Sequence, residues 1–242
     1  MIAKHLKLLL PLCLIFLTSS AWCVDLLSQG LAAQKAGKHE EAVKLLGQYL
    51  KDHQDAAPAR RALAQALNDQ GRKTEALEEI NRALESRPQD TGLLLTQGSI
   101  LAGLEQREEA IAVFSKILGQ DPKNVEALKE RGDNLAQEGR FPEAQKDYDQ
   151  AAALAPKDPW VFFKRGMGYF CQGQYPEAVT DFSTAIKLAP DRGLFYFCRG
   201  QIYLQHLHQK EKAAADFQKG CRLESPLCCQ ELEKMGIKPI KE

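Results

Sequence analysis

The sequence predicts an all-α protein in which pairs of antiparallel helices repeat along the chain. Its 242 residues are rich in alanine, leucine, glutamine, lysine and glutamate and only 7% aromatic, a composition that favours helix over strand. Alanine, glycine and proline each recur at a constant spacing of 34 residues, which indicates a structural repeat. A large apolar residue stands four positions after each alanine of the series, so both lie on one helix face.

The N-terminal segment has the pattern of a secretory signal peptide over residues 1–22. Lys4 and Lys7 precede an apolar run, and small polar residues follow it. The ten residues Leu8–Leu17 are too few to span a bilayer core, which needs about 20. We expect cleavage within residues 21–23 and export of the rest to the bacterial periplasm or cell envelope, with secretion as the other destination. An uncleaved anchor and a lipid on Cys23 stay open as alternatives.

Several columns of residues define the repeat, and each has a physical reason. Small residues on both helices of a pair let the two backbones approach closely, and proline after the second helix prevents its continuation. Glycines between the helices lie where the first helix must end with a positive φ. The columns are the alanines Ala42, Ala76, Ala110, Ala144 and Ala178; the large residues Leu46, Ile80, Phe114, Tyr148 and Phe182; the helix glycines Gly30, Gly98, Gly132, Gly166 and Gly200, with Ala64 in the same series; the prolines Pro88, Pro122, Pro156 and Pro190; and the turn glycines Gly37, Gly71, Gly139 and Gly173.

This pattern resembles the tetratricopeptide repeat family, and the stretch Trp160 to Pro190 is nearly its consensus. Six units begin near residues 23, 57, 91, 125, 159 and 193, so the repeats occupy 23–227 and a capping helix with its tail occupies 228–242. The sixth unit carries one inserted residue near His206–His208. The resemblance implies a right-handed α-solenoid with the first helix of each pair on the concave wall, and a role in binding proteins.

The concave wall of the last two repeats is apolar where the earlier repeats are polar. The family geometry assigns the second, fifth, ninth and twelfth residues of each unit to this wall. We expect a partner protein or peptide to bind there, because exposed apolar patches mark interaction sites. The alternative is that these side chains pack internally, against the inner wall or the C-terminal helix. Replacing Phe163 and Phe197 by serine is expected to abolish partner capture. The candidate residues are Trp160, Phe163, Met167, Phe170, Leu194, Phe197 and Leu204.

A second binding mode of the family, in which lysine, asparagine and arginine hold a C-terminal carboxylate, has an incomplete set of residues here. Arg61 and Lys129 stand two repeats apart, and Asn68 belongs to the second repeat alone. We therefore expect no chaperone tail as the ligand. The equal numbers of basic and acidic residues, 32 of each, also argue against nucleic acid, which requires a basic excess or stripe.

The cysteines near the C-terminus resemble the end of secreted, cysteine-bearing helical repeats, which pair two cysteines eight residues apart. The resemblance implies a Cys221–Cys229 disulfide, with Cys228 as the competing partner and free buried thiols as the alternative. Cys171 and Cys198 lie about two turns out of register and are not expected to pair. A zinc site from Cys228, Cys229 and the histidines at 206 and 208 lacks ligand-type spacing, so no metal is expected.

No catalytic motif is present in the sequence, which has no phosphate-binding glycine loop, no nucleophile elbow and no zinc-protease helix. The histidines fall in turns or at helix ends. We therefore predict a protein-binding adaptor or scaffold without enzymatic activity or cofactor. The alternatives are a structural subunit that buries the same groove in a permanent oligomer, and a membrane-tethered accessory of a secretion or envelope-assembly machine that keeps its N-terminal segment. The histidines concerned are His39, His53, His206 and His208.

Overall fold

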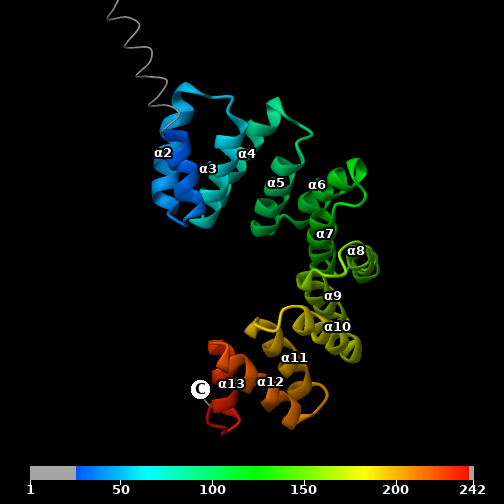
Figure 1. Ribbon diagram of the computed structural model, residues 1–242. Helices are drawn as coiled ribbons and strands as arrows, with labels where there is room; N and C mark the ends of the chain where they lie inside the picture. Colours follow the sequence, from blue (N-terminus) through cyan, green and yellow to red (C-terminus); the bar gives the residue numbers. More distant parts are fainter. Residues whose placement is uncertain (1–25, 240–242) are drawn as a thin grey trace, which may run out of the picture. The chain divides into compact units, whose positions relative to one another are not determined.

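The computed structural model describes residues 26–239, which form helices joined by short turns and contain no strand within that range (Figure 1). The predicted all-α repeat architecture is therefore confirmed. The predicted signal peptide lies outside the described residues. Between residues 26 and 239 no helix has both the length and the apolar character needed to cross a bilayer.

The chain divides into two compact units, Met1–Val113 and Phe114–Glu242, which we call unit 1 and unit 2. Residues 26–35 are helical and precede the labelled helices. The first helices of successive pairs begin at residues 34 positions apart: Ala57, Thr91, Val125, Pro159 and Gly193. The helices are α2 (His39–Asp52), α3 (Ala57–Asp69), α4 (Lys73–Ser86), α5 (Thr91–Gly103), α6 (Arg107–Gln120), α7 (Val125–Gln137), α8 (Phe141–Leu154), α9 (Pro159–Cys171), α10 (Tyr175–Leu188), α11 (Gly193–Gln205), α12 (Lys210–Arg222) and α13 (Pro226–Lys234).

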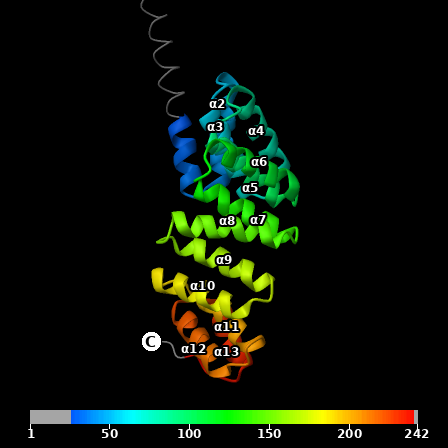
Figure 2. The same ribbon diagram turned by 90° about the vertical axis from the view of Figure 1, so that its right-hand side faces the viewer.

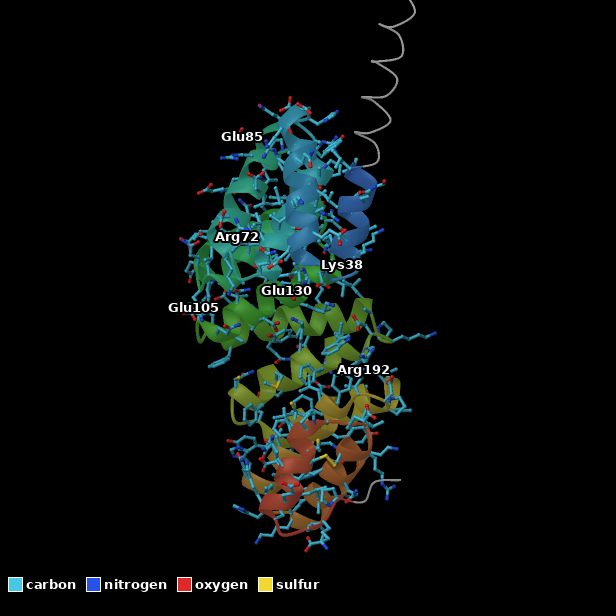
Figure 3. All side chains as sticks on the ribbon, turned by 90° about the vertical axis from the view of Figure 1, so that its left-hand side faces the viewer. Lys38, Arg72, Glu85, Glu105, Glu130 and Arg192 are labelled. Atoms are coloured by element: carbon cyan, nitrogen blue, oxygen red, sulfur yellow. A yellow bond between two sulfur atoms is a disulfide. The ribbon has the colours of Figure 1, made fainter. Side chains whose placement is uncertain are left out.

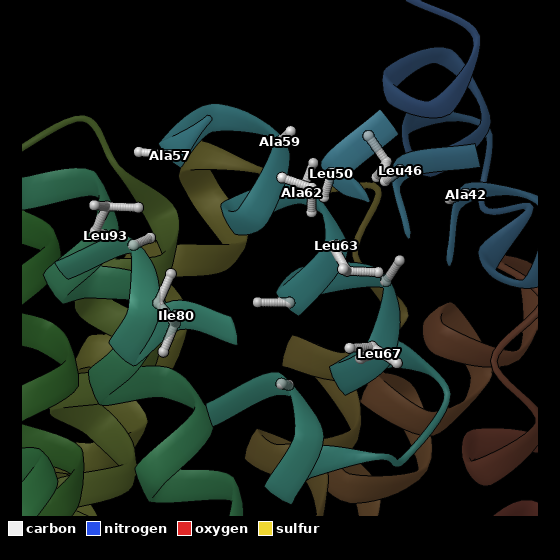
Figure 4. Packing of buried hydrophobic residues seen from close by; sticks show 14 of the residues in the cluster. Ala42, Leu46, Leu50, Ala57, Ala59, Ala62, Leu63, Leu67, Ile80 and Leu93 are labelled. Atoms are coloured by element: carbon white, nitrogen blue, oxygen red, sulfur yellow. The ribbon is translucent and has the colours of Figure 1, made fainter. Parts of the chain in front are cut away.

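Each helix packs against its neighbours along the chain, so that every pair supplies part of the core of the next pair. In unit 2 the helices α8, α9, α10 and α11 follow one another in a stack (Figure 2). The core of unit 1 consists of small and aliphatic side chains, among them Ala42, Leu46, Leu63 and Ile80 (Figure 4). The core of unit 2 adds large aromatic side chains, such as Phe182 and Phe195.

The helix glycines make room for the large residue of the second helix. A Cβ atom added at Gly166 would lie 2.9 Å from the ring of Phe182, closer than side-chain atoms pack. This contact sharpens the expected role of the glycine column, because the glycine faces an aromatic side chain and not only a helix backbone. Gly132 faces Tyr148 and Gly200 faces Phe217 in the same way, at 2.7 and 2.6 Å.

The turn between the helices of each pair contains one residue with a positive φ. The predicted glycines adopt it, for example Gly173 at 72°. In the third pair the corresponding residue is Glu105, with φ 62°, and in the sixth pair it is His208, with φ 53°. His208 stands 35 and not 34 residues after Gly173, so the turn takes up the inserted residue.

The C-terminal helix α13 closes unit 2 by packing against α12 and α11. Cys221 on α12 and Cys229 on α13 form a disulfide, with their Cα atoms 4.8 Å apart. Leu232 and the free thiol Cys228 are fully buried beneath this junction. The covalent bond and the buried side chains together fix the last helix on the end of the unit.

Candidate functional site

The site is built on helix α9, whose first turn positions Trp160. Asp158 caps the helix, and its Oδ1 atom accepts a hydrogen bond from the Trp160 backbone N–H at 2.9 Å. Pro159 begins the helix, where its missing N–H costs nothing. The Trp160 side chain is 38% exposed, although it is the largest side chain in the region. It is therefore a candidate anchor for a bound protein.

Phe163 lies one turn further along α9 and belongs partly to the core. Its ring centroid is 5.6 Å from that of Phe182 and 5.1 Å from that of Phe195, both of which are buried. Trp160 meets Phe163 and Phe195 edge to face, at 5.6 and 5.2 Å. Because of these contacts, the substitution of Phe163 by serine disturbs packing as well as the surface.

Trp160, Phe163 and Met167 line one pocket of about 380 Å³ in unit 2. Its floor includes the ring of Tyr148 from α8, which reaches the pocket because Gly168 has no side chain; a Cβ there would lie 2.8 Å from that ring. We call this the unit 2 pocket. The remaining lining residues are Asp133, Ala136, Gln137, Lys164, Gly168 and Cys171.

The structure places the other four candidate residues outside the unit 2 pocket. Phe170 lies near Tyr175 and His206, with ring centroids 6.1 and 5.6 Å away. Leu194 is 40% exposed at the start of α11. Phe197 and Leu204 are partly buried against the core cluster formed by α12 and α13. Three of the seven residues thus share one cavity, and two pack against the C-terminal part of the chain.

A buried network of charges borders the pocket. The Lys164 ammonium group pairs with Glu130 at 2.9 Å and with Asp133, and the Tyr148 hydroxyl donates a hydrogen bond to Asp133 at 2.7 Å. Glu130 projects from α7 (Figure 3). Burial would lower the pKa of Lys164, but the Asp133 and Glu130 carboxylates raise it above its ordinary value. Burial and then the Asp133 charge raise the pKa of Tyr148, so its hydroxyl stays protonated.

Lys129, which the repeat pattern assigns to the open concave wall, is buried instead. Only 8% of the residue is exposed. Its ammonium group lies 2.7 Å from Glu126 and 3.4 Å from Asp158. The expectation of an accessible lysine is corrected, because the two carboxylates hold the side chain against the protein.

The inner positions of unit 1 form polar pockets. Arg61, Lys35, Arg87 and Asp90 line one of about 280 Å³. Asn68 lines another of about 360 Å³, together with glutamine, serine and threonine side chains. Arg61 and Asn68 therefore do not share a pocket lining.

Sequence reasoning missed a ladder of arginine–aspartate pairs in unit 2. Each arginine of the first helix binds both oxygens of an aspartate on its own second helix and reaches back to a side chain of the preceding second helix. The signal was present, because the arginines recur every 34 residues. The sets are Arg131 with Asp147 and Ser115, Arg165 with Asp181 and Asp149, and Arg199 with Asp216 and Ser183.

The free cysteines differ in their surroundings. Cys171 is exposed at the pocket, and burial followed by the charge of Asp133 raises the pKa of its thiol. Burial raises the pKa of Cys198 to about 12. Cys228 is buried, and its thiol donates to the carbonyl oxygen of Gly193 at 3.7 Å. Within residues 26–239 no three histidine, cysteine or carboxylate side chains gather closely enough to hold a metal ion.

Comparison with known proteins agrees with this architecture. The family model described as "Tetratricopeptide repeat" matches residues 27–91 and 95–159, more than half of the chain, and a model described as "TPR repeat" matches residues 168–206. No curated protein matches the chain significantly. The structure of MamA from Desulfovibrio magneticus RS-1 is 24% identical with a TM-score of 0.60, covering 70% of this chain and 96% of that chain. The structure of Pseudomonas aeruginosa PilF is 18% identical with a TM-score of 0.69, covering 88% and 97%. These two likenesses show the fold.

Proposed function

Because the chain belongs to the tetratricopeptide repeat family, we propose that it is an adaptor without enzymatic activity that binds a partner protein through the unit 2 pocket. The observation that carries this proposal is the exposure of Trp160 at the wall of an apolar cavity that contains no other large side chain of the chain itself. Large aromatic residues in such positions supply most of the binding energy of protein interfaces.

The chemistry of the pocket supports a peptide ligand. Trp160 and Phe163 provide flat apolar walls, and Met167 provides a flexible one that adapts to the shape of an inserted side chain. The helix α9 that carries all three is held by the Arg165–Asp181 pair and by the packing of Gly166 on Phe182. A rigid support of this kind limits the entropy lost on binding.

We further propose that the protein acts after export, in the bacterial periplasm or cell envelope. The support is the order of basic, apolar and small residues in the first 22 positions. The mass of the mature chain tests this proposal. Loss of about 21 to 23 residues indicates cleavage, whereas a full-length mass would favour the membrane-tethered alternative.

The binding function is tested by crosslinking and pull-down from the native envelope with the full chain and with Trp160→Ala. We expect the variant to lose capture by about tenfold or more, since a central aromatic residue contributes about 2 kcal/mol or more to an interface. The matched control is Leu227→Ala, which removes an exposed apolar side chain that does not line the pocket. Capture that survives Trp160→Ala unchanged would show that the pocket is not the binding site.

Trp160 is a better probe than the pair Phe163 and Phe197. Phe163 packs on Phe182 and Phe195, and Phe197 lies 6.2 Å from Phe217, ring to ring. Their loss would weaken the fold and binding together.

The alternative of a permanent oligomer has support from Leu188 and Leu194, which are exposed in the same unit as Trp160. Light scattering after size exclusion separates the two functions. An obligate assembly would show no monomer at micromolar concentration, whereas the adaptor would be monomeric without its partner.

A further inference from the structure

We propose that the partner segment entering the unit 2 pocket is basic: one large apolar side chain fills the cavity, and lysine or arginine residues on either side pair with carboxylates at its border. This inference rests on the proposed function and specifies the chemistry of the partner. It is carried by the charges that surround the pocket, which the apolar pattern of the sequence did not show.

Two groups of charges border the pocket, and each contains one ammonium between two carboxylates. Lys164 lies between Glu130 and Asp133. Lys129 lies between Glu126 and Asp158. One positive charge cannot neutralise two negative charges, so each group keeps one negative charge in excess.

The two groups lie at different parts of the α9 wall. Asp158 caps the helix immediately before Trp160, so the first group adjoins the exposed indole. Asp133 and Lys164 line the cavity itself beside Met167, so the second group adjoins its wall. A bound segment with an apolar anchor and basic residues on both sides would therefore meet a negative group next to each flank.

Partial burial strengthens these charges. The side chains of Glu130 and Asp133 are 27% and 29% exposed, so water screens them less than it screens a free carboxylate. Glu126 has a 53% exposed side chain and is open to an approaching cation. An acidic segment would be repelled by both groups, and a neutral one would gain nothing from them.

The size of the cavity fits a single anchor. Its volume of about 380 Å³ is near the lower end of ligand pockets, which span about 300 to 1,000 Å³. Aromatic and aliphatic side chains are therefore suitable occupants, and the rest of the partner segment remains at the charged border.

Unit 1 provides an internal control. Its pocket lined by Arg61 carries Lys35 and Arg87 as well, against the single carboxylate Asp90. This pocket has a positive excess, so it should not bind the same basic segment.

The test uses the full chain and three fluorescent probe peptides in an anisotropy titration. One probe has a leucine and phenylalanine core flanked by lysines, the second has the same core flanked by glutamates, and the third has the lysines with the core replaced by alanines. We expect the first probe to bind at least about tenfold more tightly than the other two, and its affinity to fall as salt is raised.

Variants assign this binding to the pocket. Trp160→Ala should weaken binding of the lysine-flanked probe by about tenfold or more. Glu126→Gln and Glu130→Gln should each weaken it by about threefold to tenfold and flatten the salt dependence, with little change in thermal unfolding. The matched control is Glu177→Gln, an exposed first-turn carboxylate on α10 that does not line the pocket. Its binding should equal that of the unaltered chain.

Cys171 gives a second readout at the site itself. The lysine-flanked probe should slow alkylation of this exposed thiol, while Cys198, whose pKa is about 12, and buried Cys228 react little. The variant Cys171→Ser identifies the signal.

The outcomes separate this inference from the proposed function. Equal binding of the glutamate-flanked and lysine-flanked probes through Trp160 overturns the basic partner and leaves pocket binding standing. Failure of both probes, with native capture still dependent on Trp160, also overturns it. Native capture that is insensitive to Trp160→Ala overturns the proposed function itself.

Discussion

Unit 1 and unit 2 share one repeat but differ in how their helix pairs are held together. In unit 2, Arg165 binds Asp181 through two hydrogen bonds of 2.7 and 2.8 Å and reaches Asp149 at 3.0 Å. The corresponding column of unit 1 contains Gln97, which donates a single hydrogen bond to Asn81 at 2.8 Å.

The large residue facing the helix glycine differs in the same way. It is Leu46 or Ile80 in unit 1 and Tyr148 or Phe182 in the middle of unit 2. The inner wall changes in parallel, from polar pockets to the aromatic unit 2 pocket. Small residues and turn residues thus maintain the repeat in both units, while the remaining columns are free to differ. The aromatic and ionic contacts of unit 2 support the helix that carries the candidate site.

The largest expected effect comes from the large-residue column. Phe182→Ala should lower the free energy of unfolding by about 4 kcal/mol, because a fully buried ring leaves a cavity against Gly166. The matched change in unit 1, Ile80→Ala, should cost about 3 kcal/mol, since fewer atoms are removed. Urea unfolding followed by circular dichroism measures both. A smaller loss for Phe182 than for Ile80 would contradict the idea that aromatic packing strengthens unit 2.

The ion-pair ladder provides the next effect. Asp181→Ala should lower the free energy of unfolding by about 3 kcal/mol, because the Arg165 guanidinium keeps its partly buried position without its main partner. Gln97→Ala, in the corresponding column of unit 1, should cost less than about 1 kcal/mol. The same unfolding experiment compares them. Equal losses would show that the ladder adds nothing beyond an ordinary hydrogen bond.

Spacing alone predicted the parts of the fold that depend on local chemistry. Gly166 and Phe182 follow from close packing within one pair, and Gly173 follows from the positive φ that a helix end requires. The helix caps Asp90 and Asn124 also recur at the 34-residue spacing, and each accepts a hydrogen bond of 3.0 Å from its first turn.

The candidate site could be predicted only in part, because its contacts join different repeats. The exposure of Trp160 depends on how Phe195, from the next pair, packs beneath it. Lys129 is buried because Asp158, 29 residues later in the chain, lies beside it. Such contacts depend on the angle between neighbouring pairs, which a periodic pattern does not encode.

The disulfide at the end of unit 2 is expected to contribute about 2.5 kcal/mol. Replacing Cys221 and Cys229 together by serine frees a short loop and increases the entropy of the unfolded chain by that amount. Unfolding of the double variant and of the reduced unaltered chain should agree. Unit 1 has no disulfide among its described residues 26–113, so reduction should leave the effect of Ile80→Ala unchanged. A change in that effect would show that the two ends of the chain unfold together.

The smallest expected effect concerns the turns, where the units differ at one residue. Glu105 in unit 1 adopts φ 62°, while Gly173 in unit 2 adopts φ 72°. A left-handed residue with a side chain costs about 1 to 2 kcal/mol, and glycine adds about 0.4 to 1 kcal/mol of entropy to the unfolded chain. Glu105→Gly should therefore stabilise the protein by about 0.5 kcal/mol, and Gly173→Ala should destabilise it by about 1 kcal/mol. Thermal unfolding of both variants measures the difference. Destabilisation by Glu105→Gly would mean that the glutamate side chain contributes contacts that outweigh its backbone strain.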